Sequence, residues 1–307
     1  TAFKFDNSLP LSDSTAPDGV KPWYSSMATI TGTASDSLAG SGFGANAQQI
    51  KIRKMAGAGN QYWTGGSWAV NITTINVVNS AGTVVSWTYD ASLVDWGVSG
   101  SSYAVASRIK DKADNQQAWG AERVFKWDVD VPTSAITSPA NYSYLGTTPF
   151  FYGTYYDLHS GISPSGGKVE LLIMDQTAVP TQWYWGSAWQ TVPPPTNDDW
   201  VDASVWASSW TYQMPVTLTP NHQYLVVSRA KDSSSPGNYQ TTFETGTSSN
   251  TFICDNQNPS TYIGTPSTTY RDQLTSISGT AQDSPQASQL KRVEIEIAYP
   301  ANKPAYA

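Results

Sequence analysis

The chain has 307 residues and a formal net charge of −7, from 17 basic and 24 acidic side chains. This acidic composition argues against nucleic acid as a partner, because phosphate backbones bind to basic surfaces. Aromatic residues make up 12% of the chain, which excludes intrinsic disorder. No apolar run approaches the roughly 20 residues that cross a bilayer, so we expect no membrane span in this segment.

Few residues of this chain suit metal or nucleophilic chemistry. Cys254 is the single cysteine, and His159 and His222 are the only histidines. A lone cysteine forms no disulfide within the chain, and this set offers little for zinc or thiol catalysis. We therefore predict that the protein is not an enzyme, and its polar, tryptophan-rich composition fits an exported protein.

Several motifs recur in the same order with a period of about 120 residues, which indicates repeated structural units. The recurring pairs include residues 87–89 with 210–212 and residues 103–111 with 224–232; a Gly-Thr motif ending in Asp occurs three times, at 32–36, 153–157 and 279–283. The phase of the repeat predicts four segments. These are a closing strand of a preceding unit (1–10), two complete units (11–131 and 132–258) and the first part of a third (259–307).

Within each unit the strand signals are short and separated by turn residues. In the first unit they fall at residues 28–34, 49–55, 62–69, 84–89, 103–109 and 123–127, with a hairpin at Gly65-Gly66. No segment shows a sustained helical period. About seven antiparallel strands per unit predict an all-β chain of tandem Greek-key β-sandwiches.

Three of these motifs resemble those of tandem bacterial immunoglobulin-like (Big-type) domains, which occur in large surface and secreted proteins. They are the Gly-Thr motif, the Asp-x-x-x-Asn pattern after the sixth strand (Asp111 to Asn115) and the Phe-x-x-Asp-x-x-x-Pro boundary (Phe125 to Pro132). The resemblance implies an extracellular or cell-surface location and, for some members, calcium between domains.

Acidic residues gather where the units join. Two loops of an immunoglobulin-like sandwich lie at the end where the chain enters, so their carboxylates should face the incoming linker. The candidates are Asp6, Asp36 and Asp111 at the first joint, Asp128, Asp130, Asp157 and Asp232 at the second, and Asp255 and Asp283 at the third. Oxygen ligands from three loops suit Ca²⁺. The alternative interpretation is that each aspartate only caps a turn.

Tryptophan is concentrated in two hairpins and in one insertion. Trp63 and Trp68 flank the turn of the first hairpin, and Trp185 and Trp189 flank that of the second. Such side chains hold a hairpin closed, or they form an interface or stack on sugar rings. Trp200 and Trp206 lie beside Asp198, Asp199 and Asp202 in an insertion. We interpret this insertion as an exposed acidic loop, and a catalytic carboxylate pair is the alternative.

These features together predict a structural role. We expect a segment of an immunoglobulin-like array that forms an extracellular stalk, fibre or matrix and associates with copies of itself. One alternative is an adhesin or carbohydrate-binding module that meets surface glycans through exposed tryptophans. Another is a set of accessory domains of a secreted hydrolase.

Overall fold

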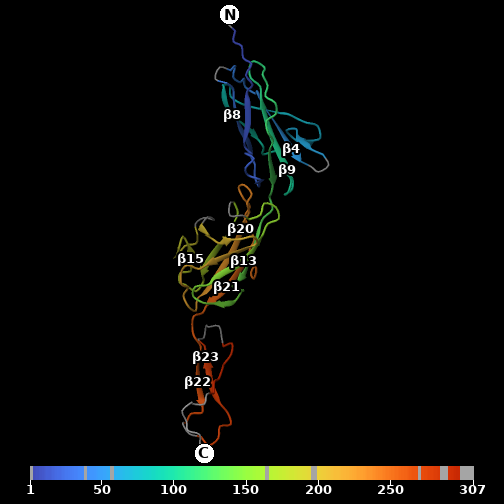
Figure 1. Ribbon diagram of the computed structural model, residues 1–307. Helices are drawn as coiled ribbons and strands as arrows, with labels where there is room; N and C mark the ends of the chain where they lie inside the picture. The colour runs from blue at the N-terminus through green and yellow to red at the C-terminus, as the bar shows by residue number, and fades with distance from the viewer. Residues whose placement is uncertain are drawn as a thin grey trace, which may run out of the picture.

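The structure, a computed structural model, describes residues 3–37, 40–55, 59–162, 166–194, 199–268, 271–283 and 290–297. Two β-sandwiches and a two-stranded segment follow one another along the long axis of the molecule (Figure 1). The described residues contain no α-helix. No helix in these ranges has the length and apolar character that crossing a bilayer requires.

The first sandwich, unit 1, consists of a three-stranded sheet facing a larger one. The smaller sheet has the order β1-β3-β8, with β1 at Leu11–Ala16, β3 at Thr29–Ser35 and β8 at Val84–Asp90. The larger has the order β2-β10-β9-β4-β5-β6, with β7 also paired to β4; these strands are β2 (Trp23–Tyr24), β10 (Arg123–Trp127), β9 (Ser102–Ile109), β4 (Gln48–Met55), β5 (Gln61–Trp63), β6 (Trp68–Ala69) and β7 (Ile75–Val77).

The second sandwich, unit 2, repeats this topology. Its smaller sheet has the order β11-β13-β19-β18, with β11 at Thr133–Ser138, β13 at Phe150–Tyr156, β19 at Ser209–Gln213 and β18 at Ser204–Val205. Its larger sheet has the order β12-β21-β20-β14-β15-β16, with β17 also paired to β14; these strands are β12 (Ser143–Leu145), β21 (Ser249–Cys254), β20 (Gln223–Lys231), β14 (Lys168–Asp175), β15 (Gln182–Trp185), β16 (Ala188–Gln190) and β17 (Val201–Asp202).

The first strand segments of each unit divide between its two sheets. In unit 1, β1 pairs antiparallel with β3, and β2 then pairs parallel with the last strand, β10. In unit 2, β11 pairs antiparallel with β13, and β12 pairs parallel with β21. This arrangement is that of an immunoglobulin-like sandwich. The chain is therefore an all-β protein of tandem immunoglobulin-like units, as the strand spacing predicted.

One packing contact explains two of the repeated motifs. Gly32 lies directly opposite Trp87 on the neighbouring strand, and Gly153 lies opposite Trp210 in the same way. A Cβ atom at Gly153 would approach the Trp210 ring to 2.2 Å. Glycine at this position thus lets a fully buried indole lie against the strand at the centre of the sandwich.

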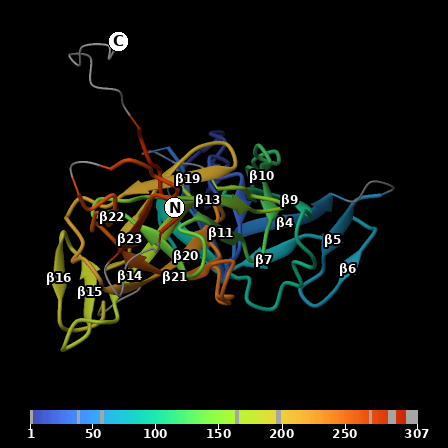
Figure 2. The same ribbon diagram turned by 90° about the horizontal axis from the view of Figure 1, so that it is seen from below.

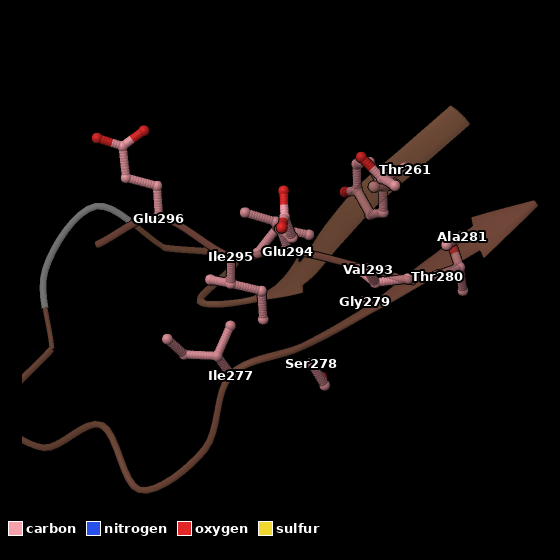
Figure 3. A pocket seen from close by; sticks show the side chains of 12 residues that line it. Thr261, Ile277, Ser278, Gly279, Thr280, Ala281, Val293, Glu294, Ile295 and Glu296 are labelled. Atoms are coloured by element: carbon pink, nitrogen blue, oxygen red, sulfur yellow. The ribbon is translucent and has the colours of Figure 1, made fainter. Parts of the chain in front are cut away.

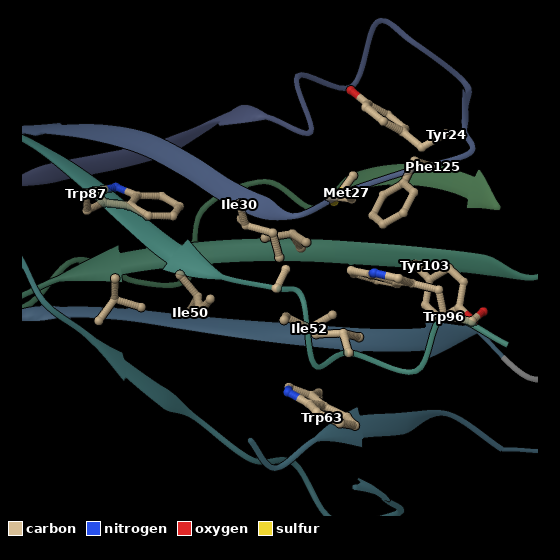
Figure 4. Packing of buried hydrophobic residues seen from close by; sticks show 14 of the residues in the cluster. Tyr24, Met27, Ile30, Ile50, Ile52, Trp63, Trp87, Trp96, Tyr103 and Phe125 are labelled. Carbon is tan, nitrogen blue, oxygen red and sulfur yellow. The ribbon is translucent and has the colours of Figure 1, made fainter. Parts of the chain in front are cut away.

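The core of unit 1 lies between its two sheets and is rich in aromatic side chains (Figure 4). Trp96 packs edge-on against Tyr103 with ring centroids 5.0 Å apart, and Tyr103 is stacked with Phe125 at 5.6 Å. Unit 2 has its own cluster, which includes Phe151, Tyr224 and Phe252. Each unit therefore buries a separate core.

The third segment consists of β22 (Ser260–Thr265) paired with β23 (Ser278–Gln282). An apolar cavity of about 380 Å³ lies on it, lined by Ile277, Val293 and Ile295 among others (Figure 3). Ile277 occupies the position two residues before the motif glycine, where Ile30 and Phe151 are fully buried. Since no second sheet covers these side chains within the described residues, we attribute the cavity to an uncovered core face.

The sequence signals located β3, β4, β8, β9 and β10 to within about a residue, but β1, β2 and β7 were not predicted. The first of these, Leu11–Ala16, has the sequence LSDSTA and contains one large apolar side chain. Its inward side chains are Ser12 and Ser14, which are buried through hydrogen bonds to other polar groups. A hydrophobic pattern cannot reveal a strand whose buried face is polar.

Candidate functional site: the carboxylate clusters at the joints

Three carboxylates converge where unit 1 meets unit 2, and each comes from a different segment. Asp128 follows β10, Asp157 follows β13 and Asp232 follows β20. One carboxylate oxygen of each lies within 4.8 Å of those of the other two. Asp128 and Asp232 are fully buried. Asp128 belongs to the linker after unit 1, whereas the other two belong to unit 2, so the cluster spans the joint.

Backbone amides hold these carboxylates in place. Asp128 Oδ2 accepts a hydrogen bond from the amide of Ser160 at 2.9 Å. Asp157 Oδ1 accepts hydrogen bonds from the amides of His159 and Gly161 at 3.1 and 2.6 Å. Asp232 Oδ1 accepts hydrogen bonds from the amides of Ser234 and Asn238 at 3.0 and 2.9 Å and from Ser234 Oγ at 2.7 Å. Turn capping therefore occurs at each aspartate, but it accounts for only part of the available acceptor capacity.

The second oxygen of Asp157 is buried and accepts no hydrogen bond. Burial raises the pKa of Asp157 above that of an ordinary carboxyl group, and the neighbouring charges of Asp128 and Asp232 add to the increase. The hydrogen bonds from Gly161 and His159 act in the opposite direction. In the described part of the chain, no lysine or arginine forms an ion pair with any of the three carboxylates.

The same arrangement occurs at the N-terminal end of unit 1. Carboxylate oxygens of Asp6, Asp36 and Asp111 lie within 4.8 Å of one another. Asp6 and Asp36 accept hydrogen bonds from the amides of Ser41 and Gly42 at 2.6 and 2.8 Å. Hydrogen bonds from backbone amides lower the pKa of Asp6, in contrast to the raised pKa of Asp157 in the other cluster.

Two asparagines that are not among the predicted joint residues connect the linker to the loop after the sixth strand. Asn115 Nδ2 donates to Asp111 Oδ2 at 2.8 Å and to the carbonyl oxygen of Asp6 at 3.1 Å. Asn238 Nδ2 donates to Asp232 Oδ2 at 2.6 Å and to the carbonyl oxygen of Asp128 at 3.0 Å. The sequence signal for both was the recurring Asp and Asn of the sixth-strand motif.

The joint between units 1 and 2 also has direct contacts. The Ser25 amide donates to the carbonyl oxygen of Ser235 at 3.0 Å, and the Ser235 amide donates to that of Trp23 at 3.1 Å. Asp130 is half-exposed and lies 2.9 Å from His159 Nδ1, and these two residues form a further potential metal-binding group with Asp128. His159 was not among the predicted ligands, because its partner lies across the joint.

The predicted third joint is less complete. Asp255 follows β21 and Asp283 follows β23, the positions that Asp128 and Asp157 hold one unit earlier. Among the described residues they belong to no group of three potential ligands. The other clusters take a carboxylate from the loop after β9 or β20, and the described residues between 260 and 297 contain no counterpart of that loop.

The tryptophan hairpins pack against their own units. Trp63 is buried, its ring centroid lies 5.5 Å from that of Trp68, and its indole donates to Tyr89 Oη at 3.0 Å. In unit 2 Tyr184, not Trp185, occupies the equivalent buried position against Trp189, with centroids 5.5 Å apart. The sequence suggests Trp185 as the counterpart of Trp63, but the structural counterpart lies one residue earlier, and a shift of one residue in a strand exchanges the two faces.

Two residues of the insertion also have structural contacts. The Arg229 guanidinium lies 4.3 Å from the centroid of the Trp200 ring, and Asp202 lies 3.4 Å from the Lys168 ammonium group. Trp206 is 55% exposed. Asp198, the third carboxylate of the predicted acidic loop, lies outside the described residues.

The donor chemistry of the two complete clusters fits a hard cation. Each offers three carboxylates from the linker and two loops, and Ca²⁺ takes six to eight oxygen ligands from carboxylates, carbonyls and water. The buried, unpartnered Asp157 Oδ2 is an oxygen that such an ion would coordinate. Without a cation, three closely placed carboxylates repel one another in a partly desolvated setting.

Comparison with known proteins gives likeness in fold only. No protein-family model matches the chain, and no curated protein matches it either. Fibronectin(III)-like modules of Clostridium thermocellum CbhA are 13% identical and align over 80% of this chain and 94% of theirs, with a TM-score of 0.36. The FN1–FN3 domains of chicken CNTN1 are 13% identical and align over 76% of this chain and 65% of theirs, with a TM-score of 0.32. A marsupial T cell receptor is 13% identical and aligns over 89% of this chain and 80% of its own, with a TM-score of 0.33.

Proposed function

We propose that this chain is a non-enzymatic structural segment of an extracellular bacterial array, in which calcium ions at the joints stiffen a stalk, fibre or matrix. The observation that carries the proposal is the repeated convergence of a linker aspartate with two loop aspartates, once at each end of unit 1. A turn cap needs one aspartate. Three from separate segments are the arrangement that a shared cation requires.

The physical effect of such an ion follows from where its ligands lie. At the second joint Asp128 belongs to the linker, and Asp157 and Asp232 belong to unit 2. The mutual repulsion of these carboxylates opposes the docked arrangement, whereas a divalent cation bound by all three converts that repulsion into attraction. The ion would thus hold the linker against unit 2, adding to the backbone contacts of Ser25 and Ser235.

The separate cores and short linkers support a mechanical role. Each unit buries its own aromatic core, so length can grow by adding units without changing the fold of those already present. The hairpins β5-β6 and β15-β16 extend to opposite sides when the molecule is viewed along its axis (Figure 2). Successive units would thereby present different sides to neighbouring copies of the chain.

Small-angle X-ray scattering with and without calcium tests this proposal. We expect the chain to have a larger maximum dimension in calcium than in chelator, and a narrower distribution of conformations. The reason is that joints without calcium sample bent arrangements. Sedimentation velocity over a concentration series would detect association between copies. Identical scattering in calcium and chelator, together with a strictly monomeric chain at all concentrations, would remove both parts of the proposal.

A further inference from the structure

An exposed aromatic stripe lies on the smaller sheet of unit 2. Phe150, Tyr152 and Tyr156 alternate along β13 with inward-facing residues, and they are 45%, 43% and 62% exposed. The rings of Phe150 and Tyr152 are stacked, with centroids 6.0 Å apart and planes inclined by 18°. We call this surface, together with the outward side chains of the neighbouring strands, the aromatic face.

The strands beside the stripe are polar but carry no charged side chain. Gln213 lies opposite Phe150, Thr211 opposite Tyr152 and Thr133 opposite Tyr156 on the adjoining strands. No Asp, Glu, Lys or Arg occurs in β11, β13, β18 or β19, all of which the structure describes. In a chain of net charge −7, four adjacent strands without charge select a neutral ligand.

The fold itself does not require these aromatic residues. In unit 1, the outward positions of the equivalent strand β3 carry Thr29, Thr31 and Ser35, at the same distances from the motif glycine. Unit 1 forms the same sheet with hydroxyl side chains there. Exposed aromatic rings at such positions add nothing to the core, and this points to a binding role.

The size of the aromatic face favours a narrow ligand. Its strands β11, β13 and β19 are six, seven and five residues long, and β18 has two. At about 4.8 Å between strands and about 3.3 Å per residue, they cover roughly 300 Å². A stable protein dimer buries about 800 Å² per partner, so this surface alone is too small for one. A polysaccharide chain has the required width, and it is neutral in many common forms.

We infer that the aromatic face binds a neutral polysaccharide. Aromatic rings stack against the C–H faces of sugar rings, and hydroxyl and amide groups beside them, here Thr211, Gln213 and Thr133, are suited to hydrogen bonds with sugar hydroxyls. Trp206, 55% exposed at the turn that joins β18 to β19, would extend the stacking surface. This inference does not depend on the calcium proposal.

Affinity electrophoresis in native gels tests the inference, because the net charge of −7 drives the chain towards the anode. The gels would contain hydroxyethylcellulose, mixed-linkage β-glucan, arabinoxylan or dextran as neutral probes, and alginate as the charged comparison. We expect retardation by at least one neutral polymer and none by alginate. The variant with Phe150→Thr, Tyr152→Thr and Tyr156→Ser should bind at least tenfold more weakly.

The triple variant carries the residues of unit 1 at each position, so we expect it to fold, with a circular dichroism spectrum like that of the unaltered protein. Tyr142→Asn, which removes a 75% exposed tyrosine outside the four strands, should bind unchanged. The inference is overturned if no neutral polymer retards the chain, or if the triple variant binds as well as the unaltered protein. It is also overturned if the aromatic face instead mediates self-association, seen as dimers that the triple variant abolishes.

Discussion

The substitution Asp157→Asn distinguishes between two interpretations of the cluster, a metal site and a set of turn caps. The amide oxygen of asparagine can still accept the hydrogen bonds from the His159 and Gly161 amides, so the capping role survives. The charge, and with it the affinity for a divalent cation, is reduced. The metal interpretation therefore predicts opposite effects of Asp157→Asn with and without calcium, whereas turn capping predicts little change in either condition.

Without calcium the variant should be more stable than the unaltered chain. Two unit charges 4.8 Å apart, the upper bound on these separations, repel by about 3.5 kcal/mol at an effective dielectric constant of about 20. Solvent and the capping hydrogen bonds offset most of this repulsion. We expect Asp157→Asn to raise the free energy of unfolding by about 1 kcal/mol at pH 7.

The gain in stability from Asp157→Asn without calcium depends on pH, and the raised pKa of Asp157 determines its direction. Because the pKa of Asp157 is raised in the folded protein, the folded state binds this proton more tightly than the unfolded chain. The resulting stabilisation of the unaltered protein is present below the ordinary carboxyl pKa and is lost as pH rises through the raised one. The gain from Asp157→Asn should therefore shrink on acidification towards pH 4.

With calcium the order should reverse. A free calcium concentration 100 times the dissociation constant stabilises the unaltered unit by about 2.7 kcal/mol. If the variant binds about 100-fold more weakly, its gain at the same concentration is RT ln 2, about 0.4 kcal/mol. Urea unfolding in calcium and in chelator measures both values. Isothermal titration calorimetry should count one fewer tight site in Asp157→Asn.

Asp90→Asn is the matched control, because Asp90 caps the Ser92 amide at 2.9 Å and belongs to none of the carboxylate clusters. It should leave the calcium response unchanged. Two results would refute the reasoning: a stability that is the same in calcium and chelator, or a calcium stabilisation of Asp157→Asn equal to that of the unaltered chain.

Three further predictions concern the fold. Gly153→Ala should lower the stability of unit 2 by about 3 kcal/mol in urea unfolding, because the new methyl group would lie 2.1 Å from a carbonyl oxygen, whereas Gly146→Ala, with open space around it, should have little effect. Cys254 is fully buried and its thiol pKa is raised to about 11, so Ellman's reagent at pH 8 should react only after unfolding; reaction in the native state would contradict this burial. Arg229→Met should cost about 3 kcal/mol, because it removes a partner of the fully buried Glu170 carboxylate, and a thermal midpoint equal to that of the unaltered chain would contradict this account.

The aromatic face is a feature that the sequence alone does not predict. The strand β13 has the sequence FFYGTYY, in which almost every residue is aromatic. Alternation cannot be read from such a run, because both faces of the strand carry large rings. Phe151 packs against Phe252 of the larger sheet, and the buried Trp210 indole lies against Gly153. This packing decides that Phe150, Tyr152 and Tyr156 point outwards.

The sequence alone determined the period of the repeat, the all-β class and the aspartates that gather at the first two joints. These follow from local patterns, since strand signals and loop residues recur at fixed places in each unit. Only the tertiary structure decided that Asn238 and His159 join the second cluster, and that Tyr184 rather than Trp185 is the buried ring of its hairpin. Such contacts depend on strand register and on the docking of one unit against the next, which are set by packing between residues far apart in the chain.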